Sequence, residues 1–267
     1  MPTSGPEGRS QAAVGAMSGP VIVARCHPAL VDHLPPPVAS ATALPDWLRT
    51  SPGKVMSDLL GGAELRTLKH CPPFLDALRT GVLLRLACAI TASDDGLVWD
   101  WPVPVPNDLD IPASPLGLHL PDQLAGTPLK PRPDQPIVKF INHWTLEAPA
   151  GFSLLVTHPF GREELPFRTL TGVVDADRFG LGHIHAPALW VDPAWRGTLE
   201  VGTPYAQVLA VPRSATRPTV EARAWTEEEA QARAQVLDDL RRTPGGYRKG
   251  YRVGPGDPGP EVDDPED

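Results

Sequence analysis

The stretch "IVKFINHWTLEAPAGFSLLVTHPF" (137–160) decides the fold prediction, because apolar residues recur in short runs that polar residues, Pro and Gly interrupt. Short runs of this kind, rich in β-branched and aromatic residues, are typical of strands. The pattern continues in "FRTLTGVVDAD" (167–177), "HAPALWVD" (185–192), "GTLEV" (197–201) and "YAQVLAVPR" (205–213). Several strands at this spacing predict a mainly β domain folded as a barrel or a sandwich.

The first half carries fewer but similar signals. "PVIVARCHPAL" (20–30) predicts a strand, and the paired prolines of "CPPFLDALRTG" (71–81) predict a short internal helix over 73–79 that ends at Gly81. We expect "VLLRLACAIT" (82–91) to form one buried strand, although its apolar run also fits a helix, and a hairpin turn follows at 94–96. Residues 102–136 contain ten prolines and predict a long irregular stretch.

A C-terminal helix is predicted over 225–242. Thr226 and Glu229 have the spacing of a capping box, and acidic residues fill the first turn while Arg241 and Arg242 occupy the last. The narrow apolar stripe of this helix would either dock on the β domain or face a partner.

Composition divides the chain into a flexible arm (1–18), a β-rich domain (19–215), a helical extension (216–252) and a disordered acidic tail (253–267). The chain has 34 prolines in 267 residues, which argues against a mostly helical protein. The tail holds six acidic and no basic residues, so it accounts for six of the eight net negative charges. The nearly neutral remainder predicts neither nucleic-acid nor membrane binding, and three widely spaced cysteines indicate free thiols in the cytoplasm.

Two aspartates are the candidate catalytic residues. Asp175 and Asp177 follow the β-branched run of "TGVVDADRFG" (171–180), where a strand-end carboxylate can orient a water or a sugar hydroxyl. Candidate ligand-binding residues are three arginines, whose guanidinium groups suit phosphate oxygens, and an amide: Arg162, Arg168, Arg178 and Gln207. Hydrolysis of a nucleotide would also need Mg²⁺. The alternative is that both aspartates cap a turn and the arginines lie on a solvated face.

The histidines suggest a second site. In "GHIHAP" (182–187), His183 and His185 are two residues apart and would share one face of a strand. With His158 or His143 they would bind a metal as cupins do, although no glutamate follows His185 at the distance that the cupin pattern requires. The alternative is that they are ordinary loop histidines.

Three segments of the second half resemble motifs of the dUTPase and dCTP-deaminase superfamily, whose fold is a β-clip barrel. They are "APAGFSLLVTHPFG" (148–161), "TGVVDADRFG" (171–180) and "GTPYAQVLAVP" (202–212), while "WVDPAWRGTLE" (190–200) is similar to a turn of the deaminase branch. The chain differs where that family has a phosphate-binding serine and, at Arg178, where it has a tyrosine. The resemblance implies a nucleotide ligand and a homo-oligomer with sites between subunits.

Most of residues 65–215 also resembles a family of unknown function found in bacteria and tailed phages. The segments that carry this likeness include "KHCPPFLDALRTG" (69–81) and "LPFRTLTGVVDADRF" (165–179). Three functions therefore remain open. The first is a β domain that binds a small nucleotide-like ligand, with hydrolysis as an added activity. The others are a non-catalytic interaction protein and a metal-dependent cupin-type enzyme.

Overall fold

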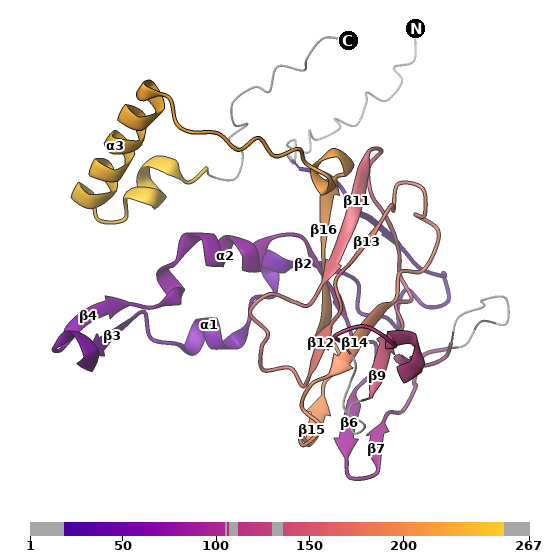
Figure 1. Cartoon of the computed structure of the whole chain (residues 1–267). Coiled ribbons are helices and arrows are strands. Elements are labelled where there is room, and N and C mark those ends of the chain that lie inside the picture. The colour runs from indigo at the N-terminus through magenta and orange to yellow at the C-terminus, as the bar shows by residue number, and fades with distance from the viewer. Residues whose placement is uncertain (1–18, 105, 107–111, 130–135, 254–267) are drawn as a thin grey trace, which may run out of the picture.

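The computed structural model describes residues 19–104, 106, 112–129 and 136–253. The predicted flexible arm (1–18) and the acidic tail, apart from Val253, lie outside these residues. The described chain is mainly β, as the sequence predicts, and its strands form antiparallel sheets that pack side by side (Figure 1). Within the described ranges the sheets do not close into a barrel.

The largest sheet has five strands in the order β13-β11-β16-β5-β2. Its strands are β2 (Val38–Ala39), β5 (Val82–Arg85), β11 (Phe152–Thr157), β13 (Gly172–Val174) and β16 (Pro204–Pro212). The long central strand β16 pairs with β11 on one side and β5 on the other, and its first five residues are all buried. A strand covered on both faces reads as a continuous apolar run, which is the pattern of "YAQVLAV".

The second sheet has four strands in the order β12-β14-β9-β8. They are β8 (Leu116–Leu118), β9 (Ile137–Phe140), β12 (Phe167–Thr169) and β14 (Ala186–Trp190). Burial alternates along β14, so that Ala186, Ala188 and Trp190 face the core. Strand β8 and the 3₁₀ turn Pro121–Leu124 show that the proline-rich stretch 102–136 is partly ordered, contrary to the prediction.

Three smaller sheets complete the fold. The hairpin of β6 (Ile90–Ser93) and β7 (Gly96–Val98) turns at the predicted residues and adds β15 (Gly197–Leu199). Strand β1 (Val23–Arg25) pairs with β10 (Thr145–Glu147), and β3 (Lys54–Ser57) pairs with β4 (Ala63–Arg66). The single strand predicted over 82–91 is wrong. The chain leaves β5 at Arg85 and starts a new sheet at Ile90, with Leu86 bonded to the turn before β16.

The core lies between the sheets. Phe140 of β9 contacts Phe167 of β12 and Tyr205 of β16, with ring centroids 4.6 and 4.9 Å apart. Buried residues of β5, β6 and β11, such as Leu84, Ile90 and Leu154, belong to the same cluster. One continuous core therefore holds the five-, four- and three-stranded sheets together.

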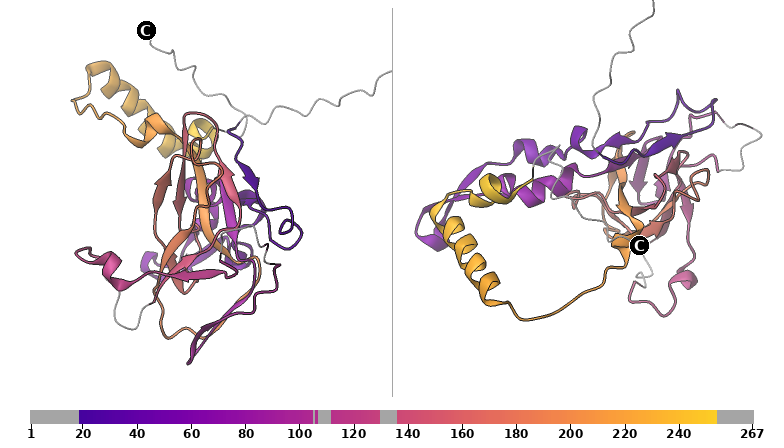
Figure 2. Two further views of the ribbon diagram at one scale, coloured as in Figure 1. Left: turned by 90° about the vertical axis from the view of Figure 1, so that its right-hand side faces the viewer. Right: turned by 90° about the horizontal axis from the view of Figure 1, so that it is seen from above.

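The helices lie on one side of this β body (Figures 1 and 2). Helix α1 (Asp46–Thr50) and the predicted internal helix, α2 (Pro72–Arg79), flank the β3–β4 hairpin, which projects away from the sheets. Trp47 of α1 donates its indole N–H to the carbonyl of Gly161 at 2.7 Å, which ties this side to the loop after β11.

Helix α3 (Glu227–Arg242) forms where the sequence predicts it, with Thr226 and Glu229 in the expected capping box. It does not dock on the β body. None of its sixteen residues, all of them described, is buried, and residues 217–226 lead to it as an extended segment (Figure 2). A short π-helix (Tyr247–Tyr251) follows, and Arg252 pairs with Asp76 of α2. Among the described helices, none has the length and apolarity that crossing a membrane requires.

Candidate functional site

The two predicted aspartates lie in one turn at an end of the five-stranded sheet. Strand β13 ends at Val174, and the backbone N–H groups of Arg178 and Phe179 both donate to the carbonyl of Asp175 at 3.0 Å. Strand β11 begins and β16 ends at the same edge, because Phe152 is the register partner of Pro212. This antiparallel pairing brings residues 151–153, 175–177 and 213 together.

Arg213 bridges the two carboxylates. Its Nε donates to Asp175 Oδ1 at 3.1 Å, and its Nη2 makes a short contact with Asp177 Oδ1. Ser153 Oγ donates to Asp175 Oδ1 at 2.7 Å, and the N–H of Gly151 donates to Asp177 Oδ2 at 3.0 Å. The sequence reasoning missed Arg213 and Ser153, although both lie at ends of predicted strands.

These bonds hold both carboxylates in the charged form. The Ser153 hydroxyl and then Arg213 lower the pKa of Asp175, and Arg213 is the largest cause of the lowered pKa of Asp177. The Asp177 side chain is only 11% exposed, whereas Asp175 is 60% exposed. Asp177 therefore stabilises the turn, whereas the more exposed Asp175 has a second oxygen, Oδ2, that these bonds leave available to accept a hydrogen bond.

This turn does not fit the Mg²⁺ that nucleotide hydrolysis would use. Three of the four carboxylate oxygens of Asp175 and Asp177 accept hydrogen bonds from the protein. In the part of the chain that the structure describes, no group of three His, Cys, Asp or Glu side chains is placed to hold a metal ion.

The three predicted metal-binding histidines do not form one cluster, because His158 lies apart from His183 and His185. His158 lies in the loop after β11, where Nδ1 accepts the N–H of Thr169 at 3.3 Å and Nε2 contacts the carbonyl of Arg162 at 3.2 Å. His183 and His185 do lie close, with parallel rings 6.3 Å apart, and His185 Nδ1 accepts the N–H of Asn142 at 3.1 Å. The metal set of His183, His185 and His158 is therefore not formed, because His158 belongs to a different loop and is bonded through both ring nitrogens.

The remaining predicted ligand residues have separate surroundings. Gln207 is buried, accepts the N–H of Phe160 at 2.9 Å and donates to the carbonyl of Thr80 at 2.5 Å, so its amide joins structural elements. Arg168 is exposed and pairs with Glu163. Arg178 is exposed in the aspartate turn. Arg162 lines a pocket.

This hollow, the Arg162 pocket, has a volume of about 420 Å³ and lies between the segment before α1 and the turn that joins β15 to β16. Its wall comes from four distant parts of the chain, represented by Ala43, Leu44 and Asp46, by Arg85, by Arg162 and Leu165, and by residues 198–204. The turn is held by the N–H of Gly202 donating to the Leu86 carbonyl at 2.9 Å and the N–H of Leu86 donating to Thr203 at 2.9 Å. Such a site gives no local sequence signal, because contacts between the sheets create it.

Two guanidinium groups face this space. The Arg162 side chain is 16% exposed, and its Nη2 donates to the carbonyl of Ala43 at 2.8 Å. Its ion pair with Glu164 is long, 3.9 Å, and burial lowers the pKa of Arg162. Arg85 donates Nε and Nη2 to the carbonyl of Pro36, while its Nη1 lies beside Gly202, where a Cβ atom would be 3.9 Å away. Both side chains keep N–H groups that those bonds do not use.

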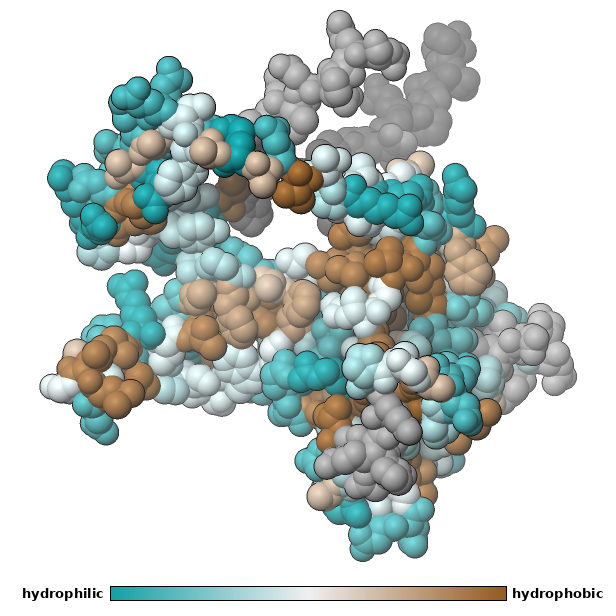
Figure 3. All heavy atoms as spheres, in the orientation of Figure 1, coloured by the Kyte–Doolittle hydropathy of each residue, from teal (hydrophilic) through white to brown (hydrophobic). Residues whose placement is uncertain are grey.

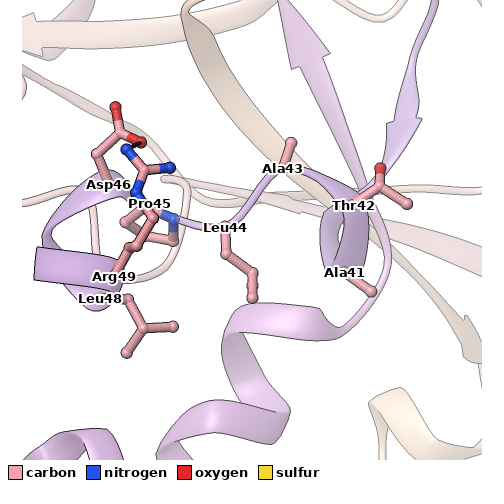
Figure 4. A pocket seen from close by; sticks show the side chains of 8 residues that line it. All are labelled: Ala41, Thr42, Ala43, Leu44, Pro45, Asp46, Leu48 and Arg49. Atoms are coloured by element: carbon pink, nitrogen blue, oxygen red, sulfur yellow. Dashed lines mark ion pairs between the residues drawn. The ribbon is translucent and has the colours of Figure 1, made fainter. Parts of the chain in front are cut away.

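A second hollow of about 550 Å³ adjoins this pocket and shares Ala43, Leu44 and Asp46 with it. Figure 4 shows that Asp46 and Arg49 turn toward each other at its edge, where their ion pair measures 3.0 Å. The side chains of Leu44 and Leu48 point away from this pair. The pair partly balances the charge of Asp46. Glu200 is the other carboxylate of the Arg162 pocket.

Comparison with known proteins identifies no family. No family model matches the chain, and no curated protein matches it. Among solved structures, the chain is similar to the native dUTPase of EIAV, with 15% identity, 36% of this chain and 73% of that chain covered, and a TM-score of 0.25. A likeness this weak and partial carries no argument about activity, and the resemblance to a bacterial and phage family has no matching model.

Proposed function

We propose that this chain binds a small phosphate-bearing, nucleotide-like ligand in the Arg162 pocket. The observation that carries the proposal is the state of Arg162. Burying a cation costs free energy unless a nearby negative charge compensates it. Its single close hydrogen bond goes to a main-chain carbonyl, and its carboxylate contact is 3.9 Å long. A phosphate oxygen in the pocket would compensate the positive charge of Arg162.

The rest of the pocket suits the other parts of such a ligand. Arg85 supplies a second guanidinium, and the planar fork of this group matches two phosphate oxygens. Leu44, Leu165 and Val201 provide apolar lining for a ring. Glu200 would accept hydrogen bonds from sugar hydroxyls, and the volume lies in the range of small-molecule sites. The proposal concerns binding of the ligand and assigns no reaction to the pocket.

The test is calorimetric titration and thermal shift with a nucleoside triphosphate, the matching nucleoside and inorganic pyrophosphate, each with and without Mg²⁺. We expect the triphosphate to bind most tightly and the nucleoside least. Arg162→Gln should weaken triphosphate binding at least ~10-fold, since one charge-assisted hydrogen bond contributes about 1.5–3 kcal/mol.

Arg168→Gln is the matched control, because Arg168 is exposed and pairs with Glu163 outside the pocket. It should bind like the unchanged chain. Arg85→Gln provides a second pocket variant that keeps the Arg162–Ala43 bond, so that a folding defect is separated from a binding defect. Equal binding by all three variants, or no binding of any phosphate compound, would refute the proposal.

A further inference from the structure

The β3–β4 hairpin is amphipathic and uncovered. The register pairs Val55 with Leu65 and Ser57 with Ala63, so these four residues share one face, while the face that carries Lys54 and Glu64 is closed by an ion pair of 2.7 Å. We call the first set the hairpin apolar face. In the turn beyond it, Leu59 is 97% exposed and Leu60 is 59% exposed. Figure 3 shows hydrophobic surface at the tip of the projecting hairpin.

A two-stranded hairpin is marginal in water unless an apolar face is buried. Strands β3 and β4 pair with each other alone in the described chain, and every residue from 54 to 66 except Ser57 is exposed. The base is firmly held, since Lys69 Nζ donates to the carbonyls of Arg49 and Ser51 at 3.1 Å. The hairpin is therefore anchored at its base, and its apolar surface is exposed to solvent.

Helix α3 has the same property. Its apolar stripe is formed by Val236, Leu237 and Leu240, which are neighbours at helical spacing, and Val236 and Leu240 are 36% and 40% exposed. Isolated helices of about this length are marginal in water even with good caps, because packing of the apolar face supplies most of their stability. The chain thus has two bare amphipathic elements, a hairpin and a helix.

Their charges are opposite in sign. The hairpin with its base (51–70) has three basic residues and two acidic ones, and α3 (227–242) has three basic residues and five acidic ones. The net charges are therefore +1 and −2. Helix α3 of the same chain does not provide the cover. The Arg252–Asp76 pair holds the end of the extension beside α2, and the Tyr251–Asp239 bond of 3.4 Å joins that end to α3. Both apolar surfaces stay exposed in that arrangement.

We propose that a second copy of this chain covers the hairpin, with the α3 stripe of each copy packed on the hairpin apolar face of the other. The two contacts are related by a twofold axis, so the dimer buries the hairpin apolar face and the α3 stripe of both copies. The extended segment 217–226 allows this exchange, since ten extended residues reach up to roughly 35 Å. The inference is independent of the ligand proposed for the Arg162 pocket.

Sedimentation equilibrium of the full chain tests the dimer. We expect a reversible monomer–dimer equilibrium that weakens at least ~10-fold in Leu65→Glu and in Leu237→Glu, because each change places a charge in an apolar contact. Met56→Glu is the matched control, since Met56 is 66% exposed on the opposite, charged face of the hairpin. It should leave the equilibrium unchanged.

Cross-linking tests the partner surfaces in a chain without native cysteines, made by Cys26→Ser, Cys71→Ser and Cys88→Ala. One sample carries Leu65→Cys and the other Leu237→Cys. We expect a disulfide-linked dimer when the two are mixed and far less when each is oxidised alone. A third sample carries both Leu65→Cys and Leu237→Cys in one chain. A chain that stays monomeric, a dimer that is unaffected by Leu65→Glu and Leu237→Glu, or an intrachain disulfide in this third sample would each overturn the proposal.

Discussion

Gln207 of β16 joins α2 to the loop after β11 through one buried amide: its Nε2 donates to the carbonyl of Thr80 at 2.5 Å. Its Oε1 accepts the N–H of Phe160 at 2.9 Å. The side chain thus satisfies main-chain groups at a helix end and in a loop, which lie 127 and 47 residues away.

Gln207→Leu should lower the free energy of unfolding by about 1–3 kcal/mol, because it removes the partner of the part-buried Phe160 N–H and Thr80 carbonyl. Urea unfolding followed by circular dichroism measures the change. Gln235→Leu on exposed α3 is the control and should stay within about 0.5 kcal/mol. Equal effects of the two substitutions would contradict the assigned role.

The aspartate turn should depend more on Asp177 than on Asp175. Asp177 is nearly buried between Arg213 and the Gly151 N–H, so Asp177→Asn should lower the Tm by about 3–6 °C, and Asp175→Asn by less. Differential scanning calorimetry gives both values. Arg213→Gln should resemble Asp177→Asn, whereas Arg178→Gln, at an exposed residue of the same turn, should have little effect. The reverse order would show that the turn is not held by Arg213.

Two glycines with positive φ allow the stability cost of backbone strain to be distinguished from the cost of a steric clash. Gly81 has φ +74°, and a Cβ atom there would lie 2.2 Å from the carbonyl oxygen of Val208. Gly61 has φ +61° and open space around it. Gly61→Ala should therefore cost about 1–2 kcal/mol, the ordinary penalty of the left-handed region, and Gly81→Ala clearly more. Equal losses in urea unfolding would mean that the chain just before β5 does not approach β16 this closely.

Acid should destabilise the fold through its histidines. Burial, then Lys139 and the neighbouring His183 and His143, lower the pKa of His185 to about 4, and burial also lowers the pKa of His143, His158 and His183. The unfolded chain, with histidine pKa values near 6.5, binds more protons than the folded chain below that pH. Stability is therefore full above pH 6.5 and falls as the pH drops from 6.5 to about 4.

For His185 alone this loss amounts to about 2–3 kcal/mol. Urea unfolding at several pH values measures it, and NMR titration of the His185 ring gives the pKa directly. His185→Asn should flatten the dependence, because an amide oxygen still accepts the Asn142 N–H but does not titrate. A His185 pKa near 6.5 would contradict the prediction.

Local sequence patterns determined the elements of this protein whose signals lie within a few residues. The capping box of Thr226 and Glu229 and the turn at 94–96 formed where predicted, because caps and turn residues act on neighbouring groups. Each apolar run of the second half also contains a strand, but the runs 137–149 and 167–177 each divide into two strands of different sheets. The mainly β class follows from the same information. The break between β5 and β6 did not, since an unbroken apolar run does not show where a chain changes sheets.

Tertiary contacts decided the site. The sequence placed Asp175 and Asp177 at a strand end, but only the pairing of β11 with β13 and β16 brought Arg213 and Ser153 to them. The same holds for the Arg162 pocket, whose wall joins segments up to 161 residues apart, and for Gln207, which faces inward. A residue's type and spacing specify which bonds it is able to make, whereas its partners depend on which distant strands the core packs together.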